Sequence, residues 1–202
     1  LRFLSPLGRA KDNWNDIGYT PEEYGAFYND TLEYMIQTTN SGKFIREGFA
    51  TMVTSMSAGL SPVNYMEMRS PCGAGIGQIA YHWNGDVYTC DEARMLGERG
   101  DPAFRLGSVH ASTYDELISN NTLKAVALAS IIESAPDCET CAFSPFCGLC
   151  PVYNHDRYGS IARTLPGDYR CEVMKTLLHT ILKKLSPSAG SSHSTLLRWA
   201  NI

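Results

Sequence analysis

Four cysteines lie close together in one short stretch of the chain, "CETCAFSPFCGLCP", which runs from Cys138 to Pro151. They are Cys138, Cys141, Cys147 and Cys150. Disulfides, a zinc site and an iron–sulfur cluster each explain such a density of thiols. The three differ in the loop geometry they require, so this stretch constrains the fold and the chemistry more than any other.

The number and spacing of the cysteines favour an iron–sulfur cluster. The chain has seven cysteines, an odd number, and we see no secretory leader, so we expect no disulfide framework. A zinc ribbon separates its two Cys-x-x-Cys arms by roughly 15 to 20 residues, whereas five residues separate Cys141 from Cys147. The intervening residues are mostly apolar, and proline follows Cys150, as in many cluster loops.

Composition excludes several other classes of protein. Hydrophobic residues make up 44% of the 202 residues and the net charge is −4, typical of a globular protein. The charge balance offers no basic stripe, so we expect no nucleic-acid partner. No apolar run reaches the roughly 18 residues of a membrane span, so we expect a cytoplasmic protein without a membrane partner. The chain begins at Leu1 rather than Met, and we expect it to be a segment of a longer protein.

Local signals predict an α+β fold. Thr20, Pro21 and Glu23 predict a capped helix over residues 18–37, and Asn84–Gly85 predicts a β-hairpin over residues 78–90. The hairpin would bring Cys90 back towards Cys72. The remaining expectations are a strand within residues 1–10, helices over residues 43–60, 113–118, 121–134 and 166–185, and a flexible Ser-rich linker over residues 186–194.

The order of the cysteines resembles a known signature. The pattern is Cys72-x12-Gly85-x4-Cys90, a gap, Cys138-x2-Cys141-x5-Cys147-x2-Cys150, another gap, and Cys171. It resembles the seven-cysteine signature of the SPASM domain, the C-terminal extension of many radical SAM enzymes that modify peptides and proteins. The match covers about residues 70–185, and one gap is two residues here where three is common. The phrases "SPCGAGIGQIAY", "GDVYTCDEARM" and "FRLGSV" resemble the maturase of the His-Xaa-Ser peptide system.

The resemblance implies a domain layout. Residues 1–68 would be the C-terminal part of a radical SAM barrel, a partial β/α barrel, with its linker. Residues 69–185 would be the SPASM domain, which combines a β-hairpin, helices and cysteine-rich loops that bind clusters. Residues 186–202 would be a flexible C-terminal tail.

The resemblance also implies two auxiliary 4Fe–4S clusters. Cys138, Cys141, Cys147 and Cys171 would hold one cluster, and Cys72, Cys90 and Cys150 would hold the other. Two fully cysteine-ligated clusters need eight ligands, so the second cluster has either an open iron or a ligand of another type. Gln78, His82 and Asp91 lie nearby in the sequence, and the choice among them stays open.

Asp91 is the candidate catalytic residue. In a protein-modifying relative, the aspartate that follows the matching cysteine acts as a base, and Asp91 follows Cys90 in the same way. The alternative is that Asp91 caps the turn after the hairpin. For His110, His155 and His179 we expect ordinary structural roles.

The full enzyme would bind further cofactors that this segment does not bind. The chain has no Cys-x3-Cys-x2-Cys motif, so we expect S-adenosylmethionine and a third 4Fe–4S cluster in an upstream barrel and no activity from the segment alone. The expected partner is a peptide or protein substrate, and a partner maturase is left open as a second partner. Two functions remain open: the C-terminal segment of a radical SAM peptide maturase, or a non-catalytic zinc or iron–sulfur module that binds a peptide or partner protein.

Overall fold

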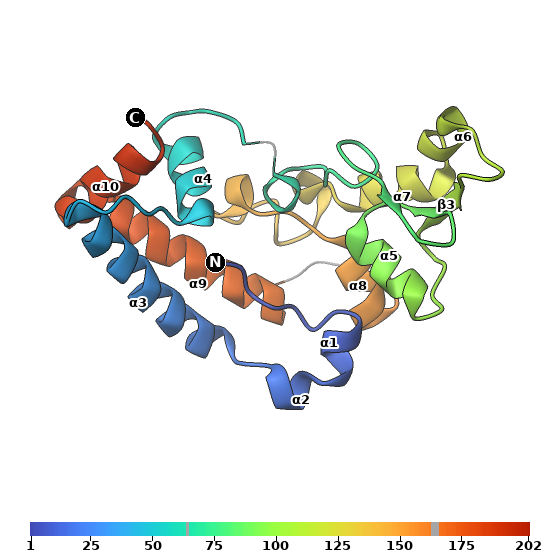
Figure 1. Ribbon diagram of the computed structural model, residues 1–202, viewed down its shortest axis with the longest axis horizontal. Helices are drawn as coiled ribbons and strands as arrows, with labels where there is room; N and C mark the ends of the chain where they lie inside the picture. The colour runs from blue at the N-terminus through green and yellow to red at the C-terminus, as the bar shows by residue number, and fades with distance from the viewer. Residues whose placement is uncertain (64, 163–165) are drawn as a thin grey trace. The chain divides into compact units, whose positions relative to one another are not determined.

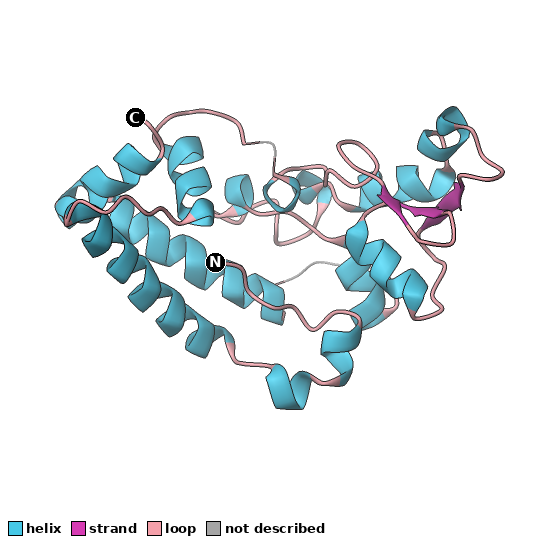
Figure 2. Cartoon of the chain, viewed as in Figure 1, coloured by secondary structure: helices cyan, strands magenta, loops and turns pink. Residues whose placement is uncertain are grey.

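The computed structural model describes residues 1–63, 65–162 and 166–202. The chain divides into two compact units (Figure 1). Unit 1 comprises Leu1–Leu4, Tyr19–Asn64 and Pro166–Ile202, and unit 2 comprises Ser5–Gly18 and Tyr65–Leu165. Helices predominate and the strands form one small sheet (Figure 2), so the α+β prediction is confirmed.

Unit 1 is helical. Its elements are α3 (Pro21–Asn40), α4 (Gly48–Ser57), α9 (Tyr169–Leu185), the 3-10 helix η4 (Pro187–Ala189) and α10 (Ser191–Trp199). Helices α3 and α9 are the longest and pack against each other, and α10 packs on α3, α4 and α9. Tyr28 and Leu32 of α3 and Val173 and Leu178 of α9 are fully buried. None of the helices in the described part of the chain is long and apolar enough to cross a membrane.

The start of α3 follows directly from its sequence. Thr20 Oγ1 accepts a hydrogen bond from the Glu23 backbone N–H at 3.1 Å, and Glu23 Oε2 accepts one from the Thr20 N–H at 2.7 Å. This capping box, with Pro21 at the first helical position, satisfies N–H groups that the helix itself leaves unpaired. The predicted helix start is confirmed.

Three local predictions were wrong. The described residues 1–10 form no strand; residues 9–12 form α1 instead. The helix expected over residues 43–60 is shorter because the buried Glu47 caps it, accepting a hydrogen bond from the Ala50 N–H at 2.6 Å. The Ser-rich segment is helical, since α10 buries Leu196 and Trp199 in unit 1.

Unit 2 contains the sheet and the short helices. The strands are β1 (Ala80–Tyr81), β2 (Asp86–Tyr88) and β3 (Arg105–Ser108). The helices are α1 (Arg9–Asp12), α2 (Trp14–Ile17), η1 (Met66–Met68), α5 (Asp91–Glu98), α6 (Tyr114–Ile118), α7 (Asn121–Ala129), η2 (Ile132–Ser134), η3 (Ser144–Phe146) and α8 (Pro151–Tyr158).

The sheet is antiparallel, and in the described part of the chain its strand order is β1-β2-β3. Tyr81 pairs with Val87 across the predicted hairpin, and Gly85 adopts φ 89° in its turn, so the Asn84–Gly85 prediction is confirmed. Strand β3 was not predicted. One face of the sheet buries Val87 and Leu106 against Leu117 of α6 and Leu123 of α7, and α5 packs on all three strands and on α8.

Candidate metal centre

The seven cysteines are distributed over both units. Cys171 lies in the first turn of α9 in unit 1, as predicted. The other six lie in unit 2. None of the seven forms a disulfide in the structure.

Cys90 and Cys150 interact electrostatically, although 60 positions separate them (150 − 90). Each is the N-cap residue of an eight-residue helix, Cys90 of α5 and Cys150 of α8, and these two helices pack together. Cys150 Sγ accepts a hydrogen bond from the Tyr153 N–H at 3.4 Å. Helix N-termini stabilise negative charge, so both thiols occupy positions that suit a thiolate or an anionic cluster.

Because Cys90 is buried, its deprotonated form is unfavourable unless a positive charge lies nearby. Desolvation raises the pKa of the Cys90 thiol well above its usual range, and the nearby Glu92 carboxylate and Cys150 thiol raise it further. The Ala93 backbone N–H opposes this shift by bonding to the sulfur. A metal ion would supply the missing positive charge and deprotonate the thiol.

Cys72 is held by the segment that follows α7. Its backbone N–H donates to Ser130 Oγ at 2.9 Å. Two residues earlier, Ser70 Oγ accepts from the Ile132 N–H at 3.0 Å and donates to Glu133. The loop that carries Cys72 is therefore fastened to η2, which leads into the cysteine-rich stretch.

The cysteine-rich stretch is a series of tight turns. The Cys141 N–H donates to the Cys138 carbonyl at 3.1 Å, and η3 turns the chain between Cys141 and Cys147. Cys138 is buried, whereas Cys141, Cys147 and Cys150 are half-buried. Tight turns of this kind point backbone N–H groups and thiols to one side of a loop, as cluster ligation requires.

The donors fit a metal centre in their chemistry but do not form a complete site. Among the residues that the structure describes, no group of three or more His, Cys, Asp or Glu side chains is arranged to hold a metal ion. Thiols are the ligands that iron–sulfur clusters and zinc prefer. Within the predicted ligand set, Cys90 and Cys150 interact electrostatically.

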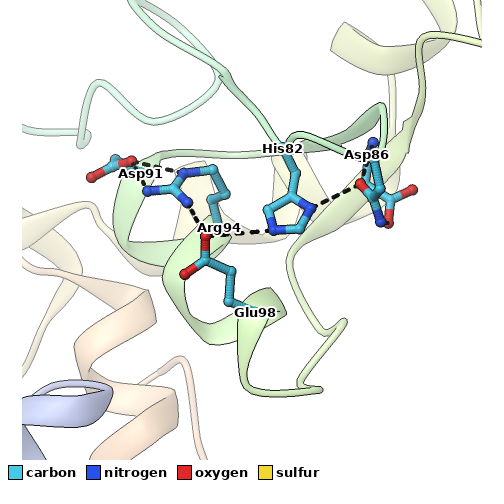
Figure 3. Close-up of polar contacts among 6 residues, drawn as sticks. His82, Asp86, Asp91, Arg94 and Glu98 are labelled. Carbon is cyan, nitrogen blue, oxygen red and sulfur yellow. Dashed lines mark hydrogen bonds and ion pairs between the residues drawn. The ribbon is translucent and has the colours of Figure 1, made fainter.

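Asp91 is the first residue of α5, directly after the N-cap Cys90. Its Oδ1 accepts hydrogen bonds from Arg94 Nε at 3.0 Å and Nη2 at 2.9 Å (Figure 3). The Asp91 side chain is 63% exposed, so a substrate could reach it. Neither α5 nor the contact with Arg94 was expected from the sequence, although acidic residues are typical of a first helical turn.

Of the two other residues considered as an eighth ligand, His82 lies apart from Cys90. His82 Nε2 is 3.5 Å from Glu98 Oε1, at the opposite end of α5 from Cys90. A helix of eight residues is about 12 Å long, so His82 and Cys90 face different ends of the same helix. Gln78 lies close to Thr89, the residue before Cys90, since the Gly75 N–H donates to the Gln78 carbonyl at 2.7 Å and to the Thr89 carbonyl at 3.0 Å. Gln78 is exposed and bridges to Ala74.

Three further histidines have ordinary surroundings. His155 Nε2 lies 2.8 Å from Asp101 Oδ2, and its ring packs edge-on against Phe104. His179 is exposed on α9, and His110 is exposed on the loop after β3.

The fold defined by these elements resembles that of part of a radical SAM/SPASM enzyme, anSMEcpe, an anaerobic sulfatase-maturating enzyme. Compared with anSMEcpe bound to AdoMet and the Kp18Cys peptide, the TM-score is 0.65 at 19% identity, over 92% of this chain and 48% of that one. For a histidine-tagged form of anSMEcpe with AdoMet the TM-score is 0.64 at 18% identity, over 92% and 46%. For native anSMEcpe with AdoMet it is 0.62 at 19% identity, over 84% and 43%.

The comparisons establish the fold and no finer relation. The chain spans less than half the length of these neighbours. No family model matches the sequence. The neighbours support a SPASM-type radical SAM fold, and they give no support to the His-Xaa-Ser system in particular.

Proposed function

We propose that this chain is the C-terminal segment of a radical SAM maturase that modifies a ribosomal peptide or protein. The observation that carries the proposal is the agreement of two independent features. The cysteine pattern resembles the SPASM signature, and the fold resembles a radical SAM/SPASM enzyme over 92% of the chain. The signature assigns Cys90 and Cys150 to one cluster, and their electrostatic interaction at the N-termini of two packed helices supports the proposal further.

In this proposal unit 2 supplies most of the cluster ligands. Cys72, Cys90 and Cys150 hold one auxiliary 4Fe–4S cluster, and Cys138, Cys141 and Cys147 hold the other with Cys171. Residues 1–68 belong to the radical SAM barrel and its linker, residues 69–185 to the SPASM domain, and residues 186–202 to the C-terminal tail. The His-Xaa-Ser maturase is the particular relative that we propose from the sequence phrases.

The chain's own residues would position the reacting groups. When bound, the auxiliary clusters supply electron transfer, which the protein tunes through hydrogen bonds to sulfur and through burial. Asp91 would accept a proton from the peptide at its exposed carboxylate, next to the Cys90 cluster. S-adenosylmethionine, which a neighbour's structure contains, and a third cluster would be bound by the upstream barrel.

The first experiment is a measurement of iron, acid-labile sulfide and zinc per chain after anaerobic reconstitution, together with a visible spectrum. About eight irons with matching sulfide, and a broad band that bleaches on reduction, are expected for two 4Fe–4S clusters. Roughly one zinc without labile sulfide would overturn the proposal in favour of a structural module that binds a peptide or a partner protein.

A further inference from the structure

Four charged or titratable side chains form one connected row along α5. Asp91 bonds to Arg94, and Arg94 Nη1 lies 2.5 Å from Glu98 Oε1. Glu98 Oε1 in turn lies 3.5 Å from His82 Nε2 (Figure 3). The row therefore connects the residue after Cys90 to the hairpin that precedes it.

Arg94 donates hydrogen bonds to only one of the two oxygens of the Asp91 carboxylate. Both Nε and Nη2 donate to Oδ1. Within the described residues, no hydrogen bond to Asp91 Oδ2 is present. An Arg–carboxylate pair usually uses both oxygens, and here the second oxygen is left facing solvent on a side chain that is 63% exposed.

Arg94 is itself held in place from two directions. Its side chain is 24% exposed, and its third contact is with Glu98. His82, 9% exposed, lies on the far side of Glu98, and its Nδ1 is 2.8 Å from Asn84 Oδ1. Because an amide oxygen only accepts, His82 Nδ1 carries the proton in this contact. His82 Nε2 makes no hydrogen bond to Glu98, so Arg94 is held on this side by its own contact with Glu98 Oε1.

We infer that Arg94 is the positioning residue for Asp91: it fixes Oδ1 and leaves Oδ2 directed away from the pair, with Glu98 holding Arg94 from the other side. This rests on the proposed role of Asp91 as a base. Pairs at i,i+3 and i,i+4 on a helix surface usually contribute only a little stability. Here the same arginine uses three N–H groups, two to Asp91 and one to Glu98.

The test is carboxylate footprinting on the reconstituted full-length protein, with a carbodiimide and glycine ethyl ester as the probe and mass spectrometry as the readout. A carboxylate held in an ion pair couples slowly. R94Q is expected to increase labelling of Asp91 several-fold, and R94K, which keeps the charge, is expected to restore most of the protection. R99Q is the matched control, because Arg99 at the end of the same helix pairs with Asp12 instead.

Two outcomes would overturn the inference: unchanged labelling of Asp91 in R94Q, or an equal increase in R99Q. The unfolding temperatures of R94Q and R99Q are compared to separate a local effect from general loosening. If no iron–sulfur cluster forms, the proposed function fails while the footprint still decides whether Arg94 holds Asp91. If clusters form and the footprint does not respond, the positioning inference fails and the proposed function stands.

Discussion

The indole N–H of Trp199 donates a hydrogen bond to Thr39 Oγ1 at 3.3 Å, joining the last turn of α10 to the last turn of α3. Thr39 also bonds to Ile45, which links the end of α3 to the loop before α4. Trp199 is fully buried. The last helix of the chain is therefore part of the core of unit 1.

Replacing Trp199 with Ala should destabilise unit 1 strongly. The change removes a fully buried aromatic side chain and leaves Thr39 without one hydrogen-bond donor. We expect the free energy of unfolding to fall by about 3–5 kcal/mol, measured by urea unfolding. Trp199→Phe keeps an aromatic ring and should cost less. Equal stability of the Ala variant and the wild type would show that α10 does not belong to the core.

Local sequence signals predicted the parts of the fold that depend on a few adjacent residues. The capping box at Thr20 and the Asn84–Gly85 turn are both present. Each is specified by hydrogen bonds or backbone angles within about four residues. Such features can be predicted from a single sequence because no distant residue is needed to form them.

Features that depend on distant residues could not be predicted in the same way. Helix α10 is polar in its first turn, and only burial of Leu196 and Trp199 against α3, α4 and α9 makes it stable. Similarly, Glu47 shortens the predicted helix because its carboxylate is buried, where it also accepts a hydrogen bond from Tyr28. Phe27 lies one helical turn from the buried Tyr24 on α3, yet it is 55% exposed.

In the candidate site, too, some features follow from a local sequence pattern and others depend on residues far apart in the chain. Spacing predicted the cysteines of the Cys138–Cys150 stretch as metal ligands because that pattern is local, and the assignment stays a prediction. The electrostatic interaction of Cys90 with Cys150 depends on the packing of α5 against α8. The contact between Asp91 and Arg94 depends on a helix start that no strong cap marks. A helical reading of "DEARMLGE" would have placed Arg94 three residues from Asp91 on one face.

Replacing Gly97 with Ala should disturb the packing of α5 on the sheet. A Cβ at this position would lie 2.3 Å from the ring and hydroxyl of Tyr88, which is buried and cannot move aside freely. We expect a loss of about 1–3 kcal/mol and weaker retention of iron at Cys90, measured by urea unfolding and iron analysis. Gly48→Ala is the control, because nothing lies within 4 Å of its Cβ. A neutral effect at Gly97 would contradict the packing.

Acid should weaken the contact between α3 and α9. Lys184 Nζ donates to Glu33 Oε2 at 2.7 Å, and this hydrogen bond lowers the pKa of Glu33 below its ordinary value of 4.5. A lowered folded-state pKa means that the contribution is present above pH 4.5 and is lost as the pH falls through the folded pKa. Because Glu33 is 40% exposed, we expect at most about 1 kcal/mol.

The measurement is urea unfolding of the wild type and Lys184→Met between about pH 7 and about pH 3.5. The difference in unfolding free energy between the two should shrink on acidification. Lys183→Met, at an exposed position on the same helix, should show no such pH dependence. If the wild type still has the higher unfolding free energy than Lys184→Met at the lowest pH, the ion pair is not the cause of that difference.

Substitution of single cysteines should remove one cluster at a time. Cys141→Ala should lose the cluster that Cys138, Cys147 and Cys171 share with it, and Cys72→Ala should affect only the cluster at Cys90 and Cys150. The physical reason is that a cluster with one ligand removed is exposed to solvent and to loss of iron, while the other keeps its full set of thiolates.

Iron and labile sulfide per chain, measured after identical anaerobic reconstitution, check this assignment. Each single variant should retain about half of the wild-type iron, and Cys72→Ala combined with Cys141→Ala should retain almost none. Cys171→Ala provides the decisive comparison, because Cys171 lies in unit 1 while Cys138, Cys141 and Cys147 lie in unit 2. If Cys171→Ala reduces iron as Cys141→Ala does, and adding it to Cys141→Ala removes no more, the two residues share a cluster. An additive loss would instead place Cys171 with the cluster at Cys90 and Cys150, and unchanged iron would remove Cys171 from the ligands altogether.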